Sequence, residues 1–350
     1  MNLLFITRTY PPLVGGMQKF ASDFYTTYQK SGEIDLLANP GGKRTLVFFV
    51  FRVLIYLFFH SKKYEIIHLF DAVISPLIPF IRIFSKAKVS VTVNGLDIVY
   101  ARFGYQRIMP FFLKKADRVI AVSQYTMKQC EYRGIPKDKI TVITNGINFD
   151  GFPISTDLEK RETLSQFNIP IEGKKILLTV GRLVKRKGHA WFLSNVMVNL
   201  PPDTIYLIAG TGPEAGILSE LIKKLNLSKK VFLLGQVTDA EKNCLYQISD
   251  LFVMPNISIQ NDQEGFGIVV LEAGRYGLPV VAAYIEGIND AVIDRITGRL
   301  VKEKDVQGFI DAITLPQIDR SKVADIVASH FEWKHIIERY HEVYGKMLAE

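Results

Sequence analysis

Short apolar segments of β-forming residues alternate along this chain with longer segments of helical periodicity, and this alternation constrains the fold more than any other feature. The apolar segments are residues 3–6, 66–69, 89–93, 118–122 and 140–143 in the first half, and 175–180, 204–209, 230–234, 251–254 and 279–283 in the second. Continuous apolar strands separated by helices indicate a parallel sheet buried on both faces. Because the pattern occurs twice, the sequence predicts an α/β fold with two doubly wound parallel sheets.

The chain is long enough for two domains. Its 350 residues exceed what one hydrophobic core commonly organises. Residues 149–171 lose the strand character of both flanking regions and contain Pro153 and Pro170, as is typical of a linker. We therefore predict two Rossmann-like domains, over residues 1–155 and 156–330, that face a central crevice.

A further helix is predicted over residues 331–350. Apolar residues recur there at helical spacing beside charged positions, namely Trp333, Ile336, Ile337, Tyr340, Val343, Tyr344 and Met347. Such a stripe is stable in water only when it is buried. We expect this helix to pack back toward the N-terminal domain.

A helix start with flanking glycines follows the predicted strand at residues 251–254. Residues 264–273 read EGFGIVVLEA. A helix beginning near Gly267 would direct its free backbone N–H groups toward the carboxyl edge of the sheet, where a diphosphate is favoured. Glu264 is then placed to accept hydrogen bonds from sugar hydroxyls, and Glu272 from ribose hydroxyls. A surface loop that simply precedes a helix is the alternative interpretation.

Four cations follow the first predicted strand of the second half, in the sequence GRLVKRKG over residues 181–188. The guanidinium of Arg182 can hold two phosphate oxygens at once, and Lys187 can add a point charge. Together they would stabilise a departing nucleoside diphosphate without a metal. A solvated basic loop is the alternative here.

Taken together, these motifs resemble the retaining glycosyltransferases of family 4, which have the GT-B fold. That family shares a Glu-x7-Glu motif and a Gly-Arg…Lys-Gly turn, and Glu264, Glu272, Arg182 and Lys187 match them. Further matches extend over nearly the whole chain, at Gly15-Gly16, Ser123, residues 145–148, residues 210–213 and residues 277–280.

The resemblance implies a donor site for a nucleotide sugar, held mainly by the second domain. It assigns Arg182 and Lys187 to the diphosphate, Glu264 to the sugar and Glu272 to the ribose. A glycine-rich loop of the first domain is expected to cover the donor phosphates. The residues expected to bind the donor are Gly15, Gly16, Arg182, Lys187, Gly212, Glu264, Phe266, Gly267, Ile268 and Glu272; those expected to act in catalysis are Glu264, Arg182, Lys187 and Asn94.

One position departs from the family. Many members have His-Gly-x-Asp where this chain has Asn94-Gly95-Leu96-Asp97. Asn94 can form hydrogen bonds but cannot titrate, which leaves the choice of sugar and the rate of transfer open. Asp97 is interpreted either as a contact on the acceptor side or as a helix cap.

Neither a metal nor a bound cofactor is expected. The chain has no Asp-x-Asp pair, no G-x-x-x-x-G-K-[ST] loop and no G-x-G-x-x-G at residues 210–216. The predicted reaction is retaining transfer of a hexose or N-acetylhexosamine from a UDP- or GDP-linked donor to a glycan or lipid-linked acceptor. A catalytically impaired sugar-nucleotide-binding protein and a sugar-nucleotide epimerase on the same fold are the alternatives.

The net charge of +8 fits phosphorylated ligands and an anionic membrane. A nucleic-acid partner is not expected, because basic stripes interleaved with aromatic residues are absent. Residues 46–59 form an apolar segment with basic flanks, too short to span a bilayer but suited either to a membrane surface or to packing on the sheet. Two widely separated cysteines, Cys130 and Cys244, fit a reducing, cytoplasmic location.

Overall fold

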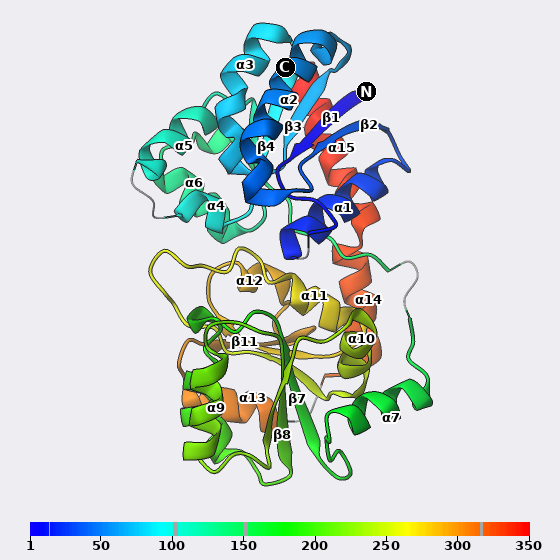
Figure 1. Cartoon of the computed structure of the whole chain (residues 1–350), viewed down its shortest axis with the longest axis vertical. Coiled ribbons are helices and arrows are strands. Elements are labelled where there is room, and N and C mark those ends of the chain that lie inside the picture. The colour runs from blue at the N-terminus through cyan, green and yellow to red at the C-terminus, as the bar shows by residue number, and fades with distance from the viewer. Residues whose placement is uncertain (14, 101–103, 150–152, 316–317) are drawn as a thin grey trace. The chain divides into compact units, whose positions relative to one another are not determined.

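The computed structural model describes residues 1–13, 15–100, 104–149, 153–315 and 318–350. Contacts along its backbone divide the chain into two compact units. The first contains residues 1–148, 261–266 and 331–350, and the second contains residues 149–260 and 267–330. Each unit is built on a parallel six-stranded sheet with helices beside it (Figure 1).

The first sheet has the strand order β2-β1-β3-β4-β5-β6. Its strands are β1 (Asn2–Thr7), β2 (Glu33–Ala38), β3 (Ile66–Leu69), β4 (Lys88–Val93), β5 (Arg118–Ala121) and β6 (Ile140–Val142). The helices of this unit are α1 (Gly16–Tyr28), α2 (Leu46–His60), α3 (Ile78–Phe84), α4 (Leu96–Val99), α5 (Tyr105–Leu113), α6 (Gln124–Tyr132) and α15 (Trp333–Ala349).

The second sheet has the strand order β12-β11-β10-β7-β8-β9. Its strands are β7 (Lys175–Val180), β8 (Thr204–Ala209), β9 (Val231–Gly235), β10 (Leu251–Met254), β11 (Val280–Tyr284) and β12 (Gly298–Lys302). Its helices are α7 (Asp157–Gln166), α8 (His189–Asn195), α9 (Ala215–Lys224), α10 (Asp239–Ile248), α11 (Ile268–Arg275), α12 (Ile288–Ala291), α13 (Val306–Thr314) and α14 (Arg320–Phe331). Short 3-10 helices include η2 (Ser61–Lys63), η3 (Ala72–Leu77) and η5 (Lys185–Lys187).

All ten strands predicted from the sequence are present, with ends that differ by at most one residue. The prediction missed β2 and β12, and each of these lies at an edge of its sheet. Edge strands can be covered less completely than central ones. The sequences of β2 and β12, EIDLLA and GRLVK, accordingly carry charged residues within the strand. Such strands lack the continuous apolar run that marked the others.

Helices bury both faces of the first sheet. Alternate side chains of a strand point to opposite faces, and Leu4 and Ile6 of β1 accordingly lie in one buried cluster with Val53 and Leu57 of α2. On the other face the ring of Phe5 stacks on Phe24 of α1, with centroids 4.9 Å apart. This two-sided burial explains why the strands read as continuous apolar runs.

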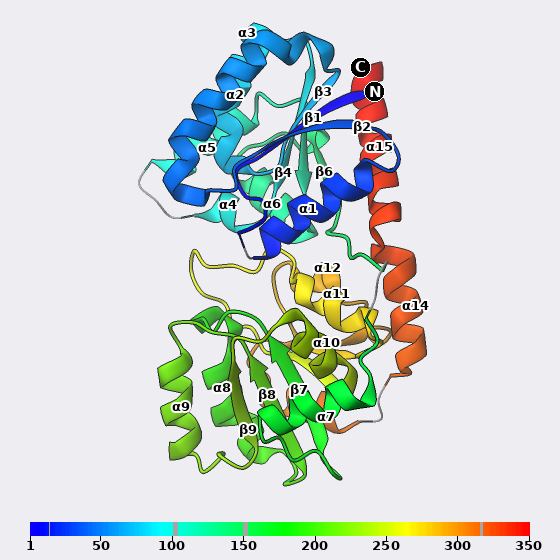
Figure 2. The same cartoon turned by 45° about the vertical axis from the view of Figure 1, so that its right-hand side comes forward.

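Helix α15 closes the second of these faces, where it packs beside α1 (Figure 2). All seven residues of the predicted apolar stripe are buried. The indole of Trp333 stacks on Phe20, with ring centroids 5.4 Å apart, and a Cβ atom added at Gly146 would come within 2.5 Å of that indole. The Ile147 N–H donates to the Phe331 carbonyl (2.7 Å), and the Trp333 N–H donates to the Ile147 carbonyl (3.1 Å).

A small polar group is enclosed beneath α15. His68 forms hydrogen bonds with Ser90 (2.7 Å), Thr92 (3.0 Å) and Tyr344 (3.0 Å). Burial lowers the pKa of His68 to about 3, so the ring is neutral. These partners give His68 a structural role in the core of the first unit.

We expect Trp333→Ala to destabilise the first unit strongly. The change leaves a cavity between α15 and α1, and large-to-small changes of a buried tryptophan cost about 3–5 kcal/mol. The matched control is Leu348→Ala on the same helix, where the side chain is 40% exposed. Calorimetric unfolding should show a clear loss for Trp333→Ala and little change for the control; equal transitions would contradict this packing.

Candidate active site

The carboxyl ends of three neighbouring strands bring together the loops of the candidate site in the second unit. In a parallel sheet these ends share one edge, and β7 lies between β10 and β8. Gly181 and Arg182 follow β7, residues 210–213 follow β8, and Pro255 follows β10. The predicted motifs of this unit are therefore adjacent through the strand order alone.

The loops after β7 and β8 pack backbone against backbone. The Gly181 N–H donates to the Ala209 carbonyl, and the Leu183 N–H donates to the Thr211 carbonyl, both at 2.9 Å. Gly210 has φ 142°, and a Cβ atom there would overlap the Gly181 carbonyl oxygen. A side chain at this position is thus excluded by both conformation and space. The two loops are thus joined through their backbones, and we call them the platform.

The two predicted cations of this platform differ in exposure. Arg182 is exposed, so its guanidinium is open to a ligand. Lys187, in η5, is only 6% exposed, and its Cε lies 3.8 Å from the position that a Cβ atom of Gly181 would take. The lysine side chain therefore runs back beneath the end of β7. A buried cation at a strand end is unlike the solvated loop that was the alternative interpretation.

Helix α11 starts where the sequence predicted, with Gly267 as its N-cap in a left-handed conformation. No side chain forms a capping hydrogen bond there, and the first turn contains no acidic residue. The first N–H groups of a helix have no partner within the helix and carry partial positive charge. An anion placed here would meet these N–H groups directly.

Glu272 contacts the protein rather than open solvent. Its carboxylate accepts a hydrogen bond from the Tyr246 hydroxyl (3.1 Å) and lies 3.7 Å from the Lys242 ammonium. Both partners belong to α10, so the carboxylate links α11 to α10. An ionised carboxylate has further lone pairs for hydroxyl groups, and the ribose role remains a prediction.

The Glu264 end of the motif groups with the first unit. Within that unit the Gly265 Cα lies 2.6 Å from the position of a Cβ atom at Gly95. A Cβ atom at Gly265 would overlap the Asn94 carbonyl oxygen. The segment beside Glu264 therefore lies directly against Asn94-Gly95, whereas residues 267–272 group with the second unit.

Asn94 and Asp97 form a tight turn after β4. Asp97 is 6% exposed, and its carboxyl group accepts hydrogen bonds from the N–H groups of Asn94 (2.8 Å) and Ala72 (3.1 Å). The Asn94 amide donates to the Phe70 carbonyl (3.1 Å). Asn94 is thus held by the Phe70 carbonyl, which follows β3, and by the Asp97 carboxyl group. Asp97 is the second residue of α4, whose N-cap is Gly95 and which has no side-chain capping hydrogen bond. Asp97 is therefore not a helix cap, and a contact on the acceptor side stays a prediction.

A buried ion pair supports this turn and was not predicted. Arg8, after β1, pairs with Asp71, after β3. Burial, together with the Asp71 carboxylate, raises the pKa of Asp97 to about 7. The available sequence signal was charged residues directly after buried strands, but only the strand order places Arg8 beside Asp71.

Two further predicted residues lie at the start of α1. Gly16 is its first residue and Gly15 its N-cap, while Val14 lies outside the described residues. Their contact with donor phosphates remains a prediction.

Within the described ranges, no group of three or more His, Cys, Asp or Glu side chains could hold a metal ion.

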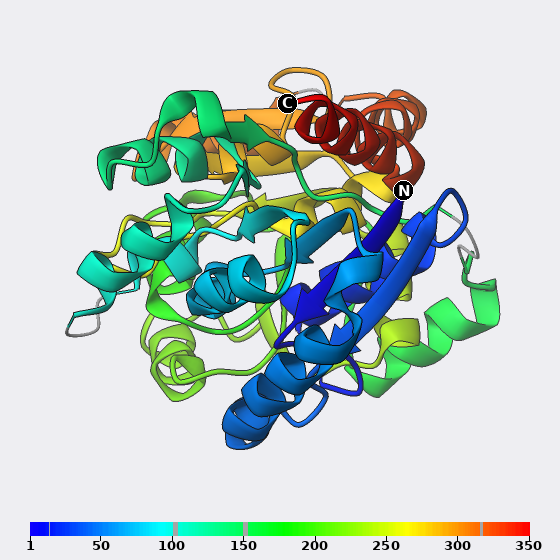
Figure 3. The ribbon, with the colours of Figure 1, turned by 90° about the horizontal axis from the view of Figure 1, so that it is seen from above.

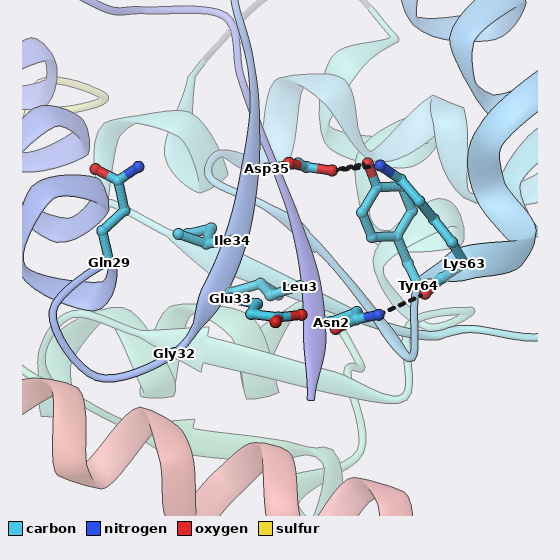
Figure 4. Close-up of a pocket in the computed structure, with 9 residues that line it drawn as sticks. All are labelled: Asn2, Leu3, Gln29, Gly32, Glu33, Ile34, Asp35, Lys63 and Tyr64. Atoms are coloured by element: carbon cyan, nitrogen blue, oxygen red, sulfur yellow. Dashed lines mark hydrogen bonds and ion pairs between the residues drawn. The ribbon is translucent and has the colours of Figure 1, made fainter.

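A cavity of about 520 Å³ lies near the amino-terminal ends of strands in the first sheet (Figure 4). It is lined at the amino ends of β1 and β2 by Asn2, Glu33 and Asp35, and beyond them by Lys63 and Tyr64. The Asp35 carboxylate accepts hydrogen bonds from the Lys63 ammonium (2.7 Å) and the Tyr64 hydroxyl (2.5 Å). Because Arg8 and Asn94 follow the carboxyl ends of their strands, this cavity is separate from the candidate site.

Two family models match the chain. "Glycosyltransferase Family 4" matches residues 18–150, and "Glycosyl transferases group 1" matches residues 160–328. A Klebsiella pneumoniae protein described as an uncharacterized 41.2 kDa protein in cps region is 27% identical over 300 residues, covering 81% of this chain and 79% of that protein.

Relatives whose names state an activity match over shorter regions. The D-inositol 3-phosphate glycosyltransferase of Corynebacterium diphtheriae is 30% identical and covers 59% of this chain and 51% of its own length. The lipopolysaccharide core biosynthesis mannosyltransferase LpsB of Rhizobium meliloti is 30% identical and covers 61% of this chain and 59% of its own length. The chain thus spans about half the length of the inositol phosphate enzymes that it matches.

Two solved structures match nearly the whole chain. The Anabaena protein HepE, crystallised with UDP and glucose, has a TM-score of 0.77 at 19% identity, with coverage of 99% of this chain and 100% of HepE. The lipopolysaccharide outer core galactosyltransferase WaaB has a TM-score of 0.75 at 16% identity, with coverage of 99% and 100%. This likeness confirms the predicted two-domain α/β fold of GT-B type.

We expect Gly210→Ala to destabilise the second unit. The new Cβ atom would force the loops after β7 and β8 apart, and the backbone conformation alone costs about 1–3 kcal/mol for a non-glycine residue. Gly216→Ala in α9 is the control, because nothing lies within 4 Å of its added Cβ atom. That change should stabilise the helix by about 0.5–1 kcal/mol. Opposite shifts in the unfolding temperature are expected, and two shifts of the same sign would argue against the platform.

Asp97 should make stability depend on pH. Its pKa rises from 3.8 to about 7 on folding, so the folded chain retains a proton that the unfolded chain has lost. The resulting stabilisation is complete below about pH 4 and is lost as the pH rises through about 7. Unfolding free energies measured across this range should fall less steeply in Asp97→Asn than in wild type, whereas exposed Asp138→Asn should follow wild type.

Proposed function

Because the chain belongs to the GT-B glycosyltransferases of family 4, we propose that it transfers a hexose or N-acetylhexosamine from a UDP- or GDP-linked donor with retention of configuration. The acceptor is a glycan or a lipid-linked sugar used in cell-surface polysaccharide or glycolipid synthesis. The location is cytoplasmic. The observation that supports the proposal best is the grouping of two cations and a free helix N-terminus at one edge of the second sheet.

The donor diphosphate suits this edge chemically. Arg182 and Lys187 follow β7, and α11 follows the neighbouring strand β10. Arginine holds phosphate oxygens in pairs, and helix N–H groups add further donors. These groups would neutralise the leaving diphosphate without a metal ion. The HepE crystals with UDP and glucose, and a starch synthase IV structure bound to ADP and acarbose, support a nucleotide-sugar donor on this fold.

The proposed reaction proceeds on one face of the sugar. The acceptor hydroxyl attacks from the side that the diphosphate leaves, through an oxocarbenium-like state, and the leaving phosphate takes the acceptor proton. Glu264 orients the sugar hydroxyls. Asn94 contributes hydrogen bonds but no proton, because an amide does not titrate near neutral pH.

The acceptor class is proposed from the relatives. Their names include an inositol phosphate glycosyltransferase, a lipopolysaccharide core mannosyltransferase and a phosphatidylinositol mannoside mannosyltransferase. The Klebsiella relative is described as lying in a cps region. Glycan and lipid-linked acceptors are common to these names.

Asn94 favours a second candidate, a sugar-nucleotide-binding protein with impaired catalysis. Such a protein would bind the donor but neither transfer nor hydrolyse it, while an epimerase would interconvert two sugar nucleotides without an acceptor. Thermal-shift measurements with UDP, GDP, ADP and their sugars identify the donor base, because a ligand of the folded state raises its unfolding temperature. Product analysis with the stabilising donor then separates the three activities.

Arg182→Ala and Glu264→Ala should each lower the rate of transfer by about 100-fold, the usual loss when one group that stabilises the transition state is removed. Lys185→Ala is the control, because Lys185 is an exposed cation of the same turn and should leave the rate nearly unchanged. Unfolding temperatures should stay close to wild type in all three. A double variant of Arg182 and Glu264 that transfers sugar at the wild-type rate would refute this assignment.

A further inference from the structure

Helix α2 has two apolar faces, and the protein buries only one of them. Phe49, Val53 and Leu57 are at most 3% exposed and pack on the first sheet. The opposite face exposes between 61% and 77% of five large side chains, which are Phe48, Phe51, Ile55, Phe58 and Phe59. Exposed apolar residues are ordinary when single, but a continuous stripe of aromatic residues marks a binding surface.

Helix α3 extends this surface. It exposes 43% of Phe80 and 73% of Ile83. The ends of the two helices are joined, because the Ser61 hydroxyl donates to the Phe84 carbonyl (2.8 Å) and the Ser85 hydroxyl donates to the Ser61 carbonyl (3.1 Å). Figure 3 shows α2 at the periphery of the first unit. We call the exposed residues of α2 and α3 the aromatic face.

Positive charge accompanies the aromatic face. Residues 43–88 contain eight Lys and Arg and two acidic residues, so they hold six of the eight net charges of the chain. One of the two acids, Asp71, is buried against Arg8. The other is Glu65, which lines the pocket at the joined ends of α2 and α3.

A basic pocket of about 670 Å³ lies at those joined helix ends. Lys62, Lys86 and Lys88 line it together with the apolar side chains of Ile83 and Phe84. Arg82 also lines it, although its guanidinium pairs with Asp117 (2.6 Å). Ammonium groups and apolar side chains in one pocket match the chemistry of a phospholipid, which carries a phosphate next to acyl chains.

We propose that the aromatic face lies in the interface of an anionic bilayer, with a phospholipid phosphate in the basic pocket. Among the described residues no helix is long and apolar enough to cross a membrane, and the 15 residues of α2 extend about 22 Å, less than the hydrocarbon core of about 30 Å. A second copy of the chain is disfavoured as the partner of the aromatic face, because the basic residues beside that face would then lie opposite the same basic residues of the other copy. Charge therefore selects a negative surface.

This inference deepens the proposed function and rests on it for its biological role, since a lipid-linked acceptor lies in the bilayer. Vesicle binding itself can be measured without sugar transfer. Flotation of the full chain with phosphatidylcholine vesicles, with and without phosphatidylglycerol, is the direct test. Wild-type chain should bind the anionic vesicles and lose binding as salt increases.

Two variants test the two parts of the surface. Lys62→Ala with Lys86→Ala should weaken binding to anionic vesicles by about 25-fold, since each cation near such a surface contributes about fivefold. Phe51→Ser with Phe58→Ser should weaken it at least about tenfold, because each ring loses its apolar contact with lipid. The controls lie on α9 in the second unit: Ile217→Ser, where the side chain is 56% exposed, and Lys223→Ala with Lys224→Ala. They should bind like wild type.

Three results would overturn the proposal. These are equal binding of wild type to neutral vesicles, unchanged binding of both surface variants, or sedimentation of wild type as a dimer that Phe51→Ser with Phe58→Ser converts to a monomer. The thermal shift with nucleotides is measured on every variant. A variant that loses vesicle binding but keeps the nucleotide shift supports the membrane surface independently of the proposed function. A missing nucleotide shift in wild type would count against the proposed sugar transfer and not against the membrane surface.

Discussion

Parallel strand pairing is the constraint on which the rest of this structure depends. It gathers the carboxyl end of every strand at one edge of each sheet, and it requires helices on both faces because the strands are apolar on both. Residues distant in sequence, such as Arg182 and Pro255, therefore lie in adjacent loops. The proposed binding of a diphosphate depends on this placement, since the cations after β7 and the loop after β10 share one edge of the sheet.

The two edges of the first sheet carry different properties. Its carboxyl edge holds the Asn94 turn, braced by the buried pair of Arg8 and Asp71. Near its amino edge lie the joined ends of α2 and α3 with the basic pocket, and the aromatic face extends from there along α2. Substitutions in the basic pocket should therefore have little effect on the Asn94 turn, and the reverse, because the effects of well-separated substitutions usually add.

Sequence patterns predicted the central strands and α15 almost to the residue, because burial on both faces or along one stripe leaves a periodic signal. The edge strands β2 and β12 escaped because partial exposure admits charged residues. At the candidate site, the motifs located the loops, but the partners of Glu272 on α10 could not be predicted. Pairings between side chains distant in sequence depend on helix orientation, which no local pattern contains.

The return of the chain to its first unit has a consequence for biosynthesis. Trp333 and Tyr340 cover one face of the first sheet, yet the ribosome makes them only after the whole second unit. The part of that face that α15 covers therefore stays open during translation, with Phe20 and Phe24 lacking their tryptophan partner. The second unit, whose strands are contiguous in synthesis, is free to fold earlier. Vectorial synthesis thus delays completion of the first unit until the second has been made.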